Sequence, residues 1–463
     1  MSTTTRTPPA TARPDPGHLH EGRLDRMGIP RPLALGFVAV LVAMTGVGVE
    51  SNFVVPHMVA VLGSPETTVA SIVTCSSLAA LVGSYLSGAL SDLVGPRRVM
   101  VLGFTVWLVL EVLFLAALGA GSVPAAAVTY ALRGFGYPLF AFAFLVWVNR
   151  SAPPERAGAA VGWFYVAFTG GLPTLGSLVA VGAIPVLGGG TTGETGAMAV
   201  SVVLVVAGFL VVLLGVRLPD GSTRTAPAGA SAWRVLTSGI RLTATRPRIL
   251  MGFLVRLVDT APEFGMFVVM PVVIADERGW GQRRWLLMTV CVYATNILVN
   301  ALFGWVGDRI GWQRTVRWFG VVGSAAGLVA WWYVPQLVPA GSDTGYALSV
   351  AAGCLFGCML AGFVPMGAIM PALAPGHEGA AMAVYTTAAG GAAFLGTGVV
   401  TVVLALGGGG EAVTWAFVGL YACAFVMVHF LDVPRRPPAE THRSPWTSTP
   451  PCPAPRPRRT ARP

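Results

Sequence analysis

Six ionisable side chains interrupt the long apolar stretches of this sequence, and they are the first candidates for chemistry. They are Glu50, Glu111, Arg133, Arg256, Asp259 and Glu263. A charged group in apolar surroundings is costly unless it is paired or hydrated, so each is a functional candidate. An adjacent arginine favours the ionised carboxylate, whereas loss of that arginine or of its water favours the protonated one. Such pairs are therefore suited to taking up and releasing a proton.

Three of these residues share one helical face. Arg256, Asp259 and Glu263 are spaced i, i+3 and i+7, which is the repeat of one side of a helix. This face could line an internal cavity. Alternatively, Arg256 could lie near the end of a span and simply pair with Asp259.

The elements that carry these residues must lie in a membrane. The chain is 54% hydrophobic and only 11% charged, with a mean hydropathy of +0.70, whereas soluble chains carry about 25% charged residues. Its net charge of +10 comes from arginine alone, since the sequence contains no lysine. A Walker A loop requires lysine, so the chain is not a P-loop ATPase. Neither His-Glu-x-x-His nor Gly-x-Ser-x-Gly occurs, and we expect no enzyme, cofactor or metal site.

A membrane-spanning helix needs about 20 predominantly apolar residues, and twelve such runs can be counted. They lie near residues 33–60, 68–90, 99–119, 124–148, 158–184, 197–216, 249–275, 286–306, 315–334, 346–373, 379–406 and 411–431. We therefore predict an all-α integral membrane protein with six-helix bundles at 32–216 and 249–431, joined by a central loop at 217–248. Residues 1–31 and 432–463 are rich in Pro and Arg and are expected to be disordered tails.

The distribution of arginine predicts the orientation. Nearly all the basic charge lies in both tails, in the central loop and in the connections that follow spans two, four and eight, which is typical of the cytoplasmic side. The exception is the connection between spans seven and eight, with Arg278, Arg283 and Arg284 partly balanced by Asp276 and Glu277. We expect a cell-membrane protein with both termini cytoplasmic, whose basic tails contact lipid rather than nucleic acid.

A polar hairpin recurs at the same place in each half. The first copy runs from Gly88 to Arg98 and the second from Gly304 to Arg314, with Asp92 and Asp308 offset by 216 residues. Each copy places Gly four residues before Asp and Gly three residues after it. Duplicated halves of this kind are typical of secondary transporters.

These hairpins resemble the motif Gly-x-x-x-Asp-Arg-x-Gly-Arg-Arg of the major facilitator superfamily. The matching residues are Gly88, Asp92, Gly95, Arg97, Arg98, Gly304, Asp308, Arg309, Gly311 and Arg314, whereas Leu93 departs from the motif. Three short stretches also resemble the polyol permease group, which includes ribitol and arabitol transporters. They are Gly48-Val49-Glu50 with Pro56, residues 133–140 and residues 168–176. The resemblance implies two pseudo-symmetric bundles that move by alternating access.

The resemblance also assigns roles. In proton-coupled sugar porters of this superfamily an acid in span one near an arginine in span four is the proton site, and Glu50 and Arg133 match it by span and depth. The family has Gln-Gly where Gly136 and Tyr137 stand here. A permanent structural ion pair is the alternative. Because third spans tend to be peripheral in this fold, we expect Glu111 to have no role.

The hairpins could act as a conformational latch, with Asp92 facing the positive N-terminus of a neighbouring helix. Arg97 and Arg98 would then bind carboxylates or lipid phosphates. The alternative is a plain cytoplasmic loop.

A sugar alcohol needs hydroxyl partners and flat apolar walls. The candidate cavity residues are Tyr137, Trp163, Tyr165, Asp259, Glu263, Tyr293, Asn296, Asn300 and Tyr385. Each aromatic residue could equally serve packing or the membrane interface. Close helix approach and bending are expected at Gly170, Gly171, Pro173 and Gly176, and Leu172 breaks the Gly-Pro pair of drug antiporters.

We therefore expect a monomeric, proton-coupled symporter of a sugar alcohol or similar small hydroxylated solute. Three alternatives remain: a proton-coupled exporter of drugs or metabolites, uptake of an organic acid, and a membrane sensor that binds solute without moving it.

Overall fold

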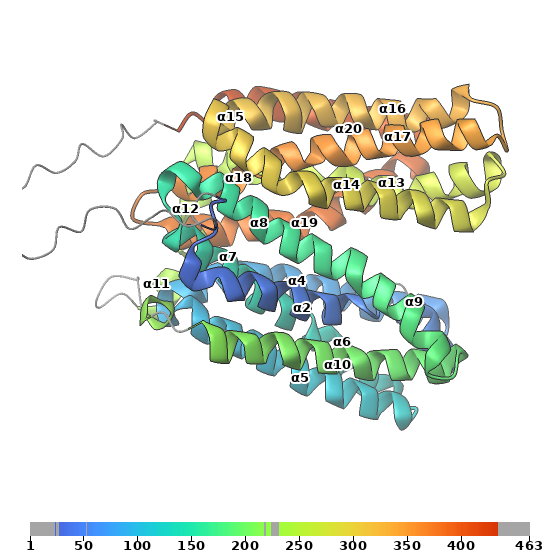
Figure 1. Cartoon of the computed structure of the whole chain (residues 1–463), viewed down its shortest axis with the longest axis horizontal. Coiled ribbons are helices and arrows are strands. Elements are labelled where there is room, and N and C mark those ends of the chain that lie inside the picture. Colours follow the sequence, from blue (N-terminus) through green and yellow to red (C-terminus); the bar gives the residue numbers. More distant parts are fainter. Residues whose placement is uncertain (1–23, 25–26, 52, 217–218, 224–230, 434–463) are drawn as a thin grey trace, which may run out of the picture.

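Helices account for all the regular secondary structure in the computed structural model, which describes residues 24, 27–51, 53–216, 219–223 and 231–433 (Figure 1). Most of the predicted tails at 1–31 and 432–463 lies outside the described residues, but residues 24, 27–31, 432 and 433 are described, and a short helix already begins at Arg31. The helices form two groups, one from each half of the chain, as the repeat predicts.

The first half contributes a row of long helices and their short connections. They are η1 (Arg31–Leu33), α2 (Ala34–Gly48), α3 (Val54–Leu62), α4 (Glu66–Val94), α5 (Pro96–Gly119), α6 (Val123–Arg133), α7 (Gly136–Ser151), η2 (Pro154–Arg156), α8 (Ala157–Thr169), η3 (Gly170–Leu175), α9 (Gly176–Val186) and α10 (Gly190–Gly215). The predicted central loop contains η4 (Pro219–Ser222), α11 (Ala232–Leu236) and α12 (Ser238–Thr245).

The second half repeats the arrangement. Its helices are α13 (Pro247–Pro271), η5 (Val272–Glu277), α14 (Gly281–Ile310), α15 (Trp312–Thr315), η6 (Val316–Gly323), α16 (Ser324–Leu337), α17 (Asp343–Leu360), η7 (Ala361–Phe363), α18 (Met366–Ala372), α19 (Glu378–Ala405) and α20 (Gly410–His429).

Eleven segments of the described chain are long and apolar enough to cross a membrane. The remaining predicted span is the helical run α15–η6–α16, which contains the less apolar residues Trp318, Trp331, Trp332 and Tyr333. With it, the chain has the twelve-helix fold that the sequence predicts.

Two spans of the first half are interrupted rather than continuous. Span one breaks between α2 and α3, and span four breaks between α6 and α7. At the first break the Ser51 hydroxyl donates to the Gly48 carbonyl at 2.6 Å, which satisfies a backbone group freed by the end of α2. Irregular backbone at membrane depth is tolerated where protein covers it, and it marks binding sites in many transporters.

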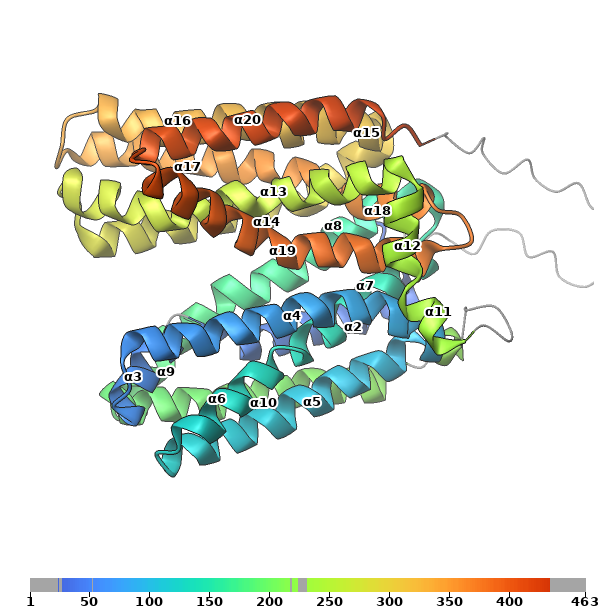
Figure 2. The same ribbon diagram turned by 180° about the vertical axis from the view of Figure 1, so that it is seen from behind.

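Both repeated hairpins turn at a glycine. Gly95 and Gly311 have φ of 88° and 107°, a backbone conformation that other residues rarely adopt. They lie at one end of the molecule, here called the motif end; the opposite end is the distal end. The two bundles converge towards the motif end and diverge towards the distal end (Figures 1 and 2).

Two of the three arginines that depart from the predicted charge distribution bind groups of the protein, and the side chain of the third, Arg283, lies outside the described residues. Arg278 donates to the Val338 carbonyl, and Arg284 binds Asp343 at 2.5 Å while lying 5.2 Å from the centre of the Tyr346 ring. At the distal end the first contact joins the residue after η5 to the residue after α16, and the other two join α14 to α17. The balancing group for Arg284 is therefore Asp343, not the expected Asp276 or Glu277.

Candidate functional site

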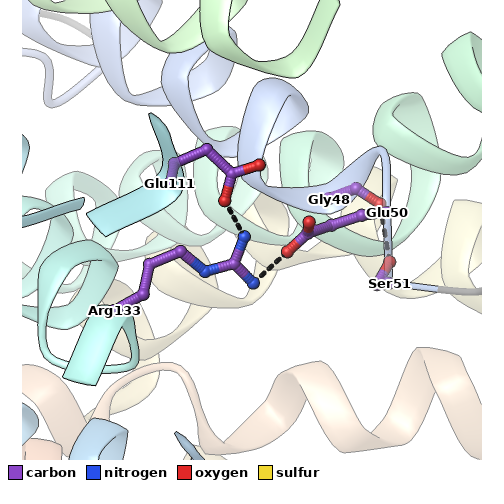
Figure 3. A network of polar contacts seen from close by, with 5 residues as sticks. All are labelled: Gly48, Glu50, Ser51, Glu111 and Arg133. Atoms are coloured by element: carbon purple, nitrogen blue, oxygen red, sulfur yellow. Dashed lines mark hydrogen bonds and ion pairs between the residues drawn. The ribbon is translucent and has the colours of Figure 1, made fainter. Parts of the chain in front are cut away.

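A buried ionic triad occupies the first bundle. The Arg133 guanidinium donates to Glu50 through one terminal nitrogen and to Glu111 through the other (Figure 3). The exposed fractions of Glu50, Glu111 and Arg133 are 3%, 0% and 5%. One cation therefore faces two carboxylates out of contact with bulk water.

The helix breaks hold the triad together. Glu50 lies in the break between α2 and α3, and Arg133 is the last residue of α6, just before the break in span four. Glu111 projects from the continuous helix α5 (Figure 3). Three separate spans thus converge on one guanidinium.

Aromatic rings enclose the arginine. Its central carbon lies 4.3 Å from the ring centre of Tyr130, 5.6 Å from Phe114 and 5.8 Å from Trp107. Such contacts partly replace the hydration of a buried guanidinium. Each carboxylate, however, has one oxygen without a hydrogen bond: Glu50 Oε2 and Glu111 Oε1 have no hydrogen-bond partner in the described part of the chain. With both acids ionised the triad has a surplus negative charge, which one bound proton would neutralise.

Glu111 is not peripheral, contrary to what its place in the third span led us to expect, because it is buried and paired with Arg133. Span three does face outward along much of its length, but its buried face, which includes Trp107, Glu111 and Phe114, packs inside the bundle. The surroundings of Glu111 in the sequence are uniformly apolar and do not reveal this face. The number of charged residues in these spans could have indicated the contact. The spans of the first half contain two carboxylates, Glu50 and Glu111, and one arginine at membrane depth, Arg133.

The second bundle buries its own arginine differently. Arg256 binds Asp259 at 2.6 Å across one turn of α13, and it lies 5.2 Å from the centre of the Tyr385 ring in α19. The Tyr385 hydroxyl is 2.7 Å from that of Tyr165, which belongs to α8 of the first bundle. Tyr421 of α20 donates to the Asp259 carbonyl at 3.1 Å. This cluster therefore reaches the seam between the bundles.

The other predicted cavity residues of the second half are nearby on α13 and α14. Glu263 lies beside Tyr293, whose ring stacks on Phe267 with centres 5.4 Å apart. Asn296 donates to the Gly357 carbonyl of α17 at 2.9 Å, and Asn300 donates to Asn296 at 3.2 Å. The two amides thus join α14 to α17, and their role is at least partly in packing.

Two predicted residues lie away from the Tyr165–Tyr385 pair. Tyr137 lines a small apolar hollow inside the first bundle with Met44, Trp107 and their neighbours. Trp163 donates to the carbonyl of Met27 at 3.0 Å, which ties α8 to the segment before α2. Neither contact brings the side chain to the Tyr165–Tyr385 pair.

The repeated aspartates lie at equivalent helix N-termini. Asp308 accepts hydrogen bonds from the backbone nitrogens of Gly158 and Ala159, at 3.0 and 2.9 Å, at the start of α8. Asp92 binds Arg150 at 2.5 Å and lies against Gly379 at the start of α19. Each aspartate thus lies on one bundle and approaches the positive end of a helix from the other.

The glycine that precedes each aspartate by one turn allows this approach. A Cβ at Gly88 would lie 2.6 Å from the backbone nitrogen of Ala383, and one at Gly304 would lie 2.3 Å from the Gly158 carbonyl oxygen. The Thr386 hydroxyl adds a 2.6 Å bond to the Ser84 carbonyl. The motif end is therefore closed in this structure.

The arginines of the hairpins make fewer contacts than the aspartates. Arg97 donates to the Leu213 carbonyl at 3.3 Å, and Arg309 lies 3.9 Å from the centre of the Trp305 ring. Arg98 and Arg314 are exposed.

The predicted bending residues form the π-helical segment η3 between α8 and α9. Gly170, Gly171 and Pro173 lie within it, and Gly176 begins α9. A Cβ at Gly176 would lie 2.4 Å from the Gly48 carbonyl carbon, so η3 packs directly against the end of α2.

Comparison with known proteins agrees with this architecture. The family model described as Major Facilitator Superfamily matches residues 35–289 and 252–460. The chain is 33% identical to an alpha-ketoglutarate permease of Bacillus subtilis (strain 168), covering 90% of this chain and 93% of the relative. It is 31% identical to a D-arabinitol transporter and to a ribitol transporter of Klebsiella pneumoniae. The former match covers 88% of this chain and 94% of the relative, and the latter covers 91% and 97%.

Among solved structures, a proton:xylose symporter bound to 6-bromo-6-deoxy-D-glucose matches with a TM-score of 0.66. The match covers 87% of this chain and 95% of that one. At 15% sequence identity this likeness shows the fold alone.

Proposed function

Because this chain belongs to the major facilitator superfamily and is a multi-pass membrane transporter, we propose that it is a proton-coupled symporter of a neutral, polyol-like solute. The observation that carries the proposal is the triad of Arg133 with two carboxylates, Glu50 and Glu111. The surplus negative charge of the triad favours binding of a proton. The breaks in spans one and four allow the positions of Glu50 and Arg133 to change when the protein changes conformation.

The proton is held on the first bundle in this scheme. When the triad is sealed, a proton on either free carboxylate oxygen removes the surplus charge. When water reaches the triad, both carboxylates can ionise, because hydration stabilises the second negative charge. Alternating exposure of the two ends would then load the proton on one side and release it on the other.

The charges of the two buried clusters support a neutral solute. The two clusters contain four carboxylates, on Glu50, Glu111, Asp259 and Glu263, and only two arginines. Both guanidiniums already bind a carboxylate. A dicarboxylate would need cations that are free to pair with it, and these clusters offer none. The similarity to arabinitol and ribitol transporters also favours a neutral solute, whereas the similarity to an alpha-ketoglutarate permease favours the organic acid.

We propose that the solute binds at the seam between the bundles. Tyr165 and Tyr385 come from different bundles, and their hydroxyls can each donate and accept a hydrogen bond. A polyol hydroxyl could replace the bond between them. Binding would then depend on both bundles being close together, as alternating access requires.

The contacts between the bundles at the motif end would form and break during transport. Asp92 and Asp308 each join one bundle to a helix N-terminus of the other, so opening this end would break both sets of contacts together. We place this end on the cytoplasmic side, because the arginine-rich hairpins lie there.

Uptake into proteoliposomes tests the proposal. Radiolabelled ribitol, D-arabitol and 2-oxoglutarate would be offered separately, with an inward proton gradient and with a protonophore. We expect accumulation of a polyol that the protonophore reduces to simple equilibration. Gradient-driven accumulation of 2-oxoglutarate alone would show that the organic acid is the substrate, and protonophore-insensitive accumulation would overturn proton coupling.

A further inference from the structure

The connection between the bundles forms a short helical strap at the motif end. The strap comprises α11, α12 and the first residues of the membrane-spanning helix α13, which begins at Pro247, so it covers residues 232–248 (Figure 2). It therefore lies at the level where a spanning helix leaves the apolar layer, next to the lipid headgroups.

The inner face of the strap is fixed to both bundles. The Tyr85 hydroxyl of α4 donates to the Leu236 carbonyl at 2.5 Å, and the backbone of Gly239 lies against the Tyr85 ring. Val235 and Leu242 are buried. α11 packs on α4, and α12 packs on α13 and α19. The position of the outer face is thus determined by the protein.

That outer face combines apolar and basic side chains. Trp233 is 75% exposed and Ile240 is 64% exposed. Between and beyond them, Arg234, Arg241, Arg246 and Arg248 are all exposed. No carboxylate occurs from residue 221 to residue 258, and within the described part of the chain no side-chain partner is found for these four guanidiniums.

The distal end makes the contrast clear. There Arg278 and Arg284 also lie beside membrane-spanning helices, but each is bound to a carbonyl or a carboxylate of the chain. Among the described residues the arginines of the strap have no such partner, so their charge is available to a group outside the protein.

We propose that the outer face of the α11–α12 strap docks anionic phospholipid headgroups of the adjoining leaflet. Exposed tryptophan favours the membrane interface, and clustered arginines next to a spanning helix bind anionic lipid surfaces. The four arginines would bind headgroup phosphates, and Trp233 and Ile240 would enter the boundary of the acyl chains. This inference does not depend on the identity of the transported solute.

Native mass spectrometry of the detergent-solubilised full chain tests it. Phosphatidylglycerol and phosphatidylcholine with identical acyl chains would be titrated against the wild type and against a variant with all four strap arginines changed to Gln. We expect the wild type to prefer phosphatidylglycerol. We expect the four-Gln variant to bind it at least about tenfold more weakly, because each arginine contributes to the electrostatic attraction. An unchanged preference in the four-Gln variant would overturn the proposal.

Three controls separate charge from structure. Changing the same four arginines to Lys should retain the preference, since a lipid surface responds mainly to charge; its loss in the Lys variant would contradict docking. Arg284→Gln, which removes a paired arginine at the distal end, should leave the preference intact. Raising ammonium acetate from about 50 mM to about 500 mM should weaken phosphatidylglycerol binding to the wild type, a test that holds even if a variant does not fold.

Discussion

The two halves of the molecule each bury one arginine, but they compensate its charge in different ways. In the first bundle, Arg133 faces two carboxylates from two other spans and is surrounded by aromatic rings. In the second, Arg256 has one carboxylate, Asp259, on its own helix, and it also contacts Thr260 and the Tyr385 ring at the seam. The duplicated fold therefore carries two different kinds of site.

The backbone differs in the same way. Glu50 and Arg133 lie at interruptions of their spans, whereas Arg256 and Asp259 lie within the continuous helix α13. A pair at i, i+3 on one helix stays together in every conformation. A triad assembled from three spans separates when those spans move. We infer that the first cluster responds to the conformation and binds the proton, and that the second positions the tyrosines that contact the solute.

The largest effect should come from removing the first arginine. Arg133→Ala leaves two buried carboxylates without a cation, and breaking a buried ion pair costs about 3–5 kcal/mol. We expect a large fall in the melting temperature and loss of active uptake. Arg256→Ala is the matched variant: it leaves only one carboxylate uncompensated and should lower the melting temperature less. Equal losses in the two variants would remove the distinction between the clusters.

Neutralising the second carboxylate of the triad should abolish accumulation without abolishing movement of solute. Glu111→Gln leaves Arg133 and Glu50 as a neutral pair with no surplus charge for a proton to cancel. Measured in proteoliposomes, uptake driven by a proton gradient should fall to equilibration, while exchange of internal for external solute continues. If this variant still accumulates solute as the wild type does, Glu111 is only structural.

A change in the second cluster should alter affinity and leave coupling intact. Asp259→Asn weakens a charge-assisted hydrogen bond to Arg256, which is worth about 1.5–3 kcal/mol. We expect the KM for the solute to rise about tenfold with the accumulation ratio retained. Loss of accumulation at unchanged KM would assign the proton to this cluster instead.

The smallest effect is expected at the seam. Tyr385→Phe removes one hydroxyl of the Tyr165–Tyr385 pair, and a neutral hydrogen bond contributes about 0.5–1.5 kcal/mol. The KM should rise about threefold to tenfold, and Tyr165→Phe should act similarly. Trp163→Phe, which alters a residue bound to Met27 away from the seam, is the control and should leave the KM unchanged.

Much of this organisation could be predicted from the sequence. The repeat at Asp92 and Asp308 and the apolar runs predict the twelve-helix fold, because both follow from local spacing and composition. The pairing of Glu50 with Arg133 follows from the family resemblance, and the structure places the two in contact.

What the sequence did not reveal depends on which way a side chain faces. Glu111 lies on a helix that is apolar on every side, so its periodicity does not distinguish the buried face from the lipid face. The breaks beside Glu50 and Arg133 are also hidden, since the residues around them are apolar and continue the spans. Trp163 and Tyr165 are two positions apart, and only the packing of α8 shows that one reaches Met27 and the other reaches Tyr385.

The most direct test of the central claim is whether solute entry carries a proton through the triad. Solute would be added to weakly buffered proteoliposomes that contain the wild type or Glu50→Gln, and the external pH would be followed. We predict that the wild type makes the medium more alkaline as protons enter with the solute, and that Glu50→Gln gives no pH change although it still exchanges labelled solute. An undiminished alkaline shift in Glu50→Gln would contradict the account.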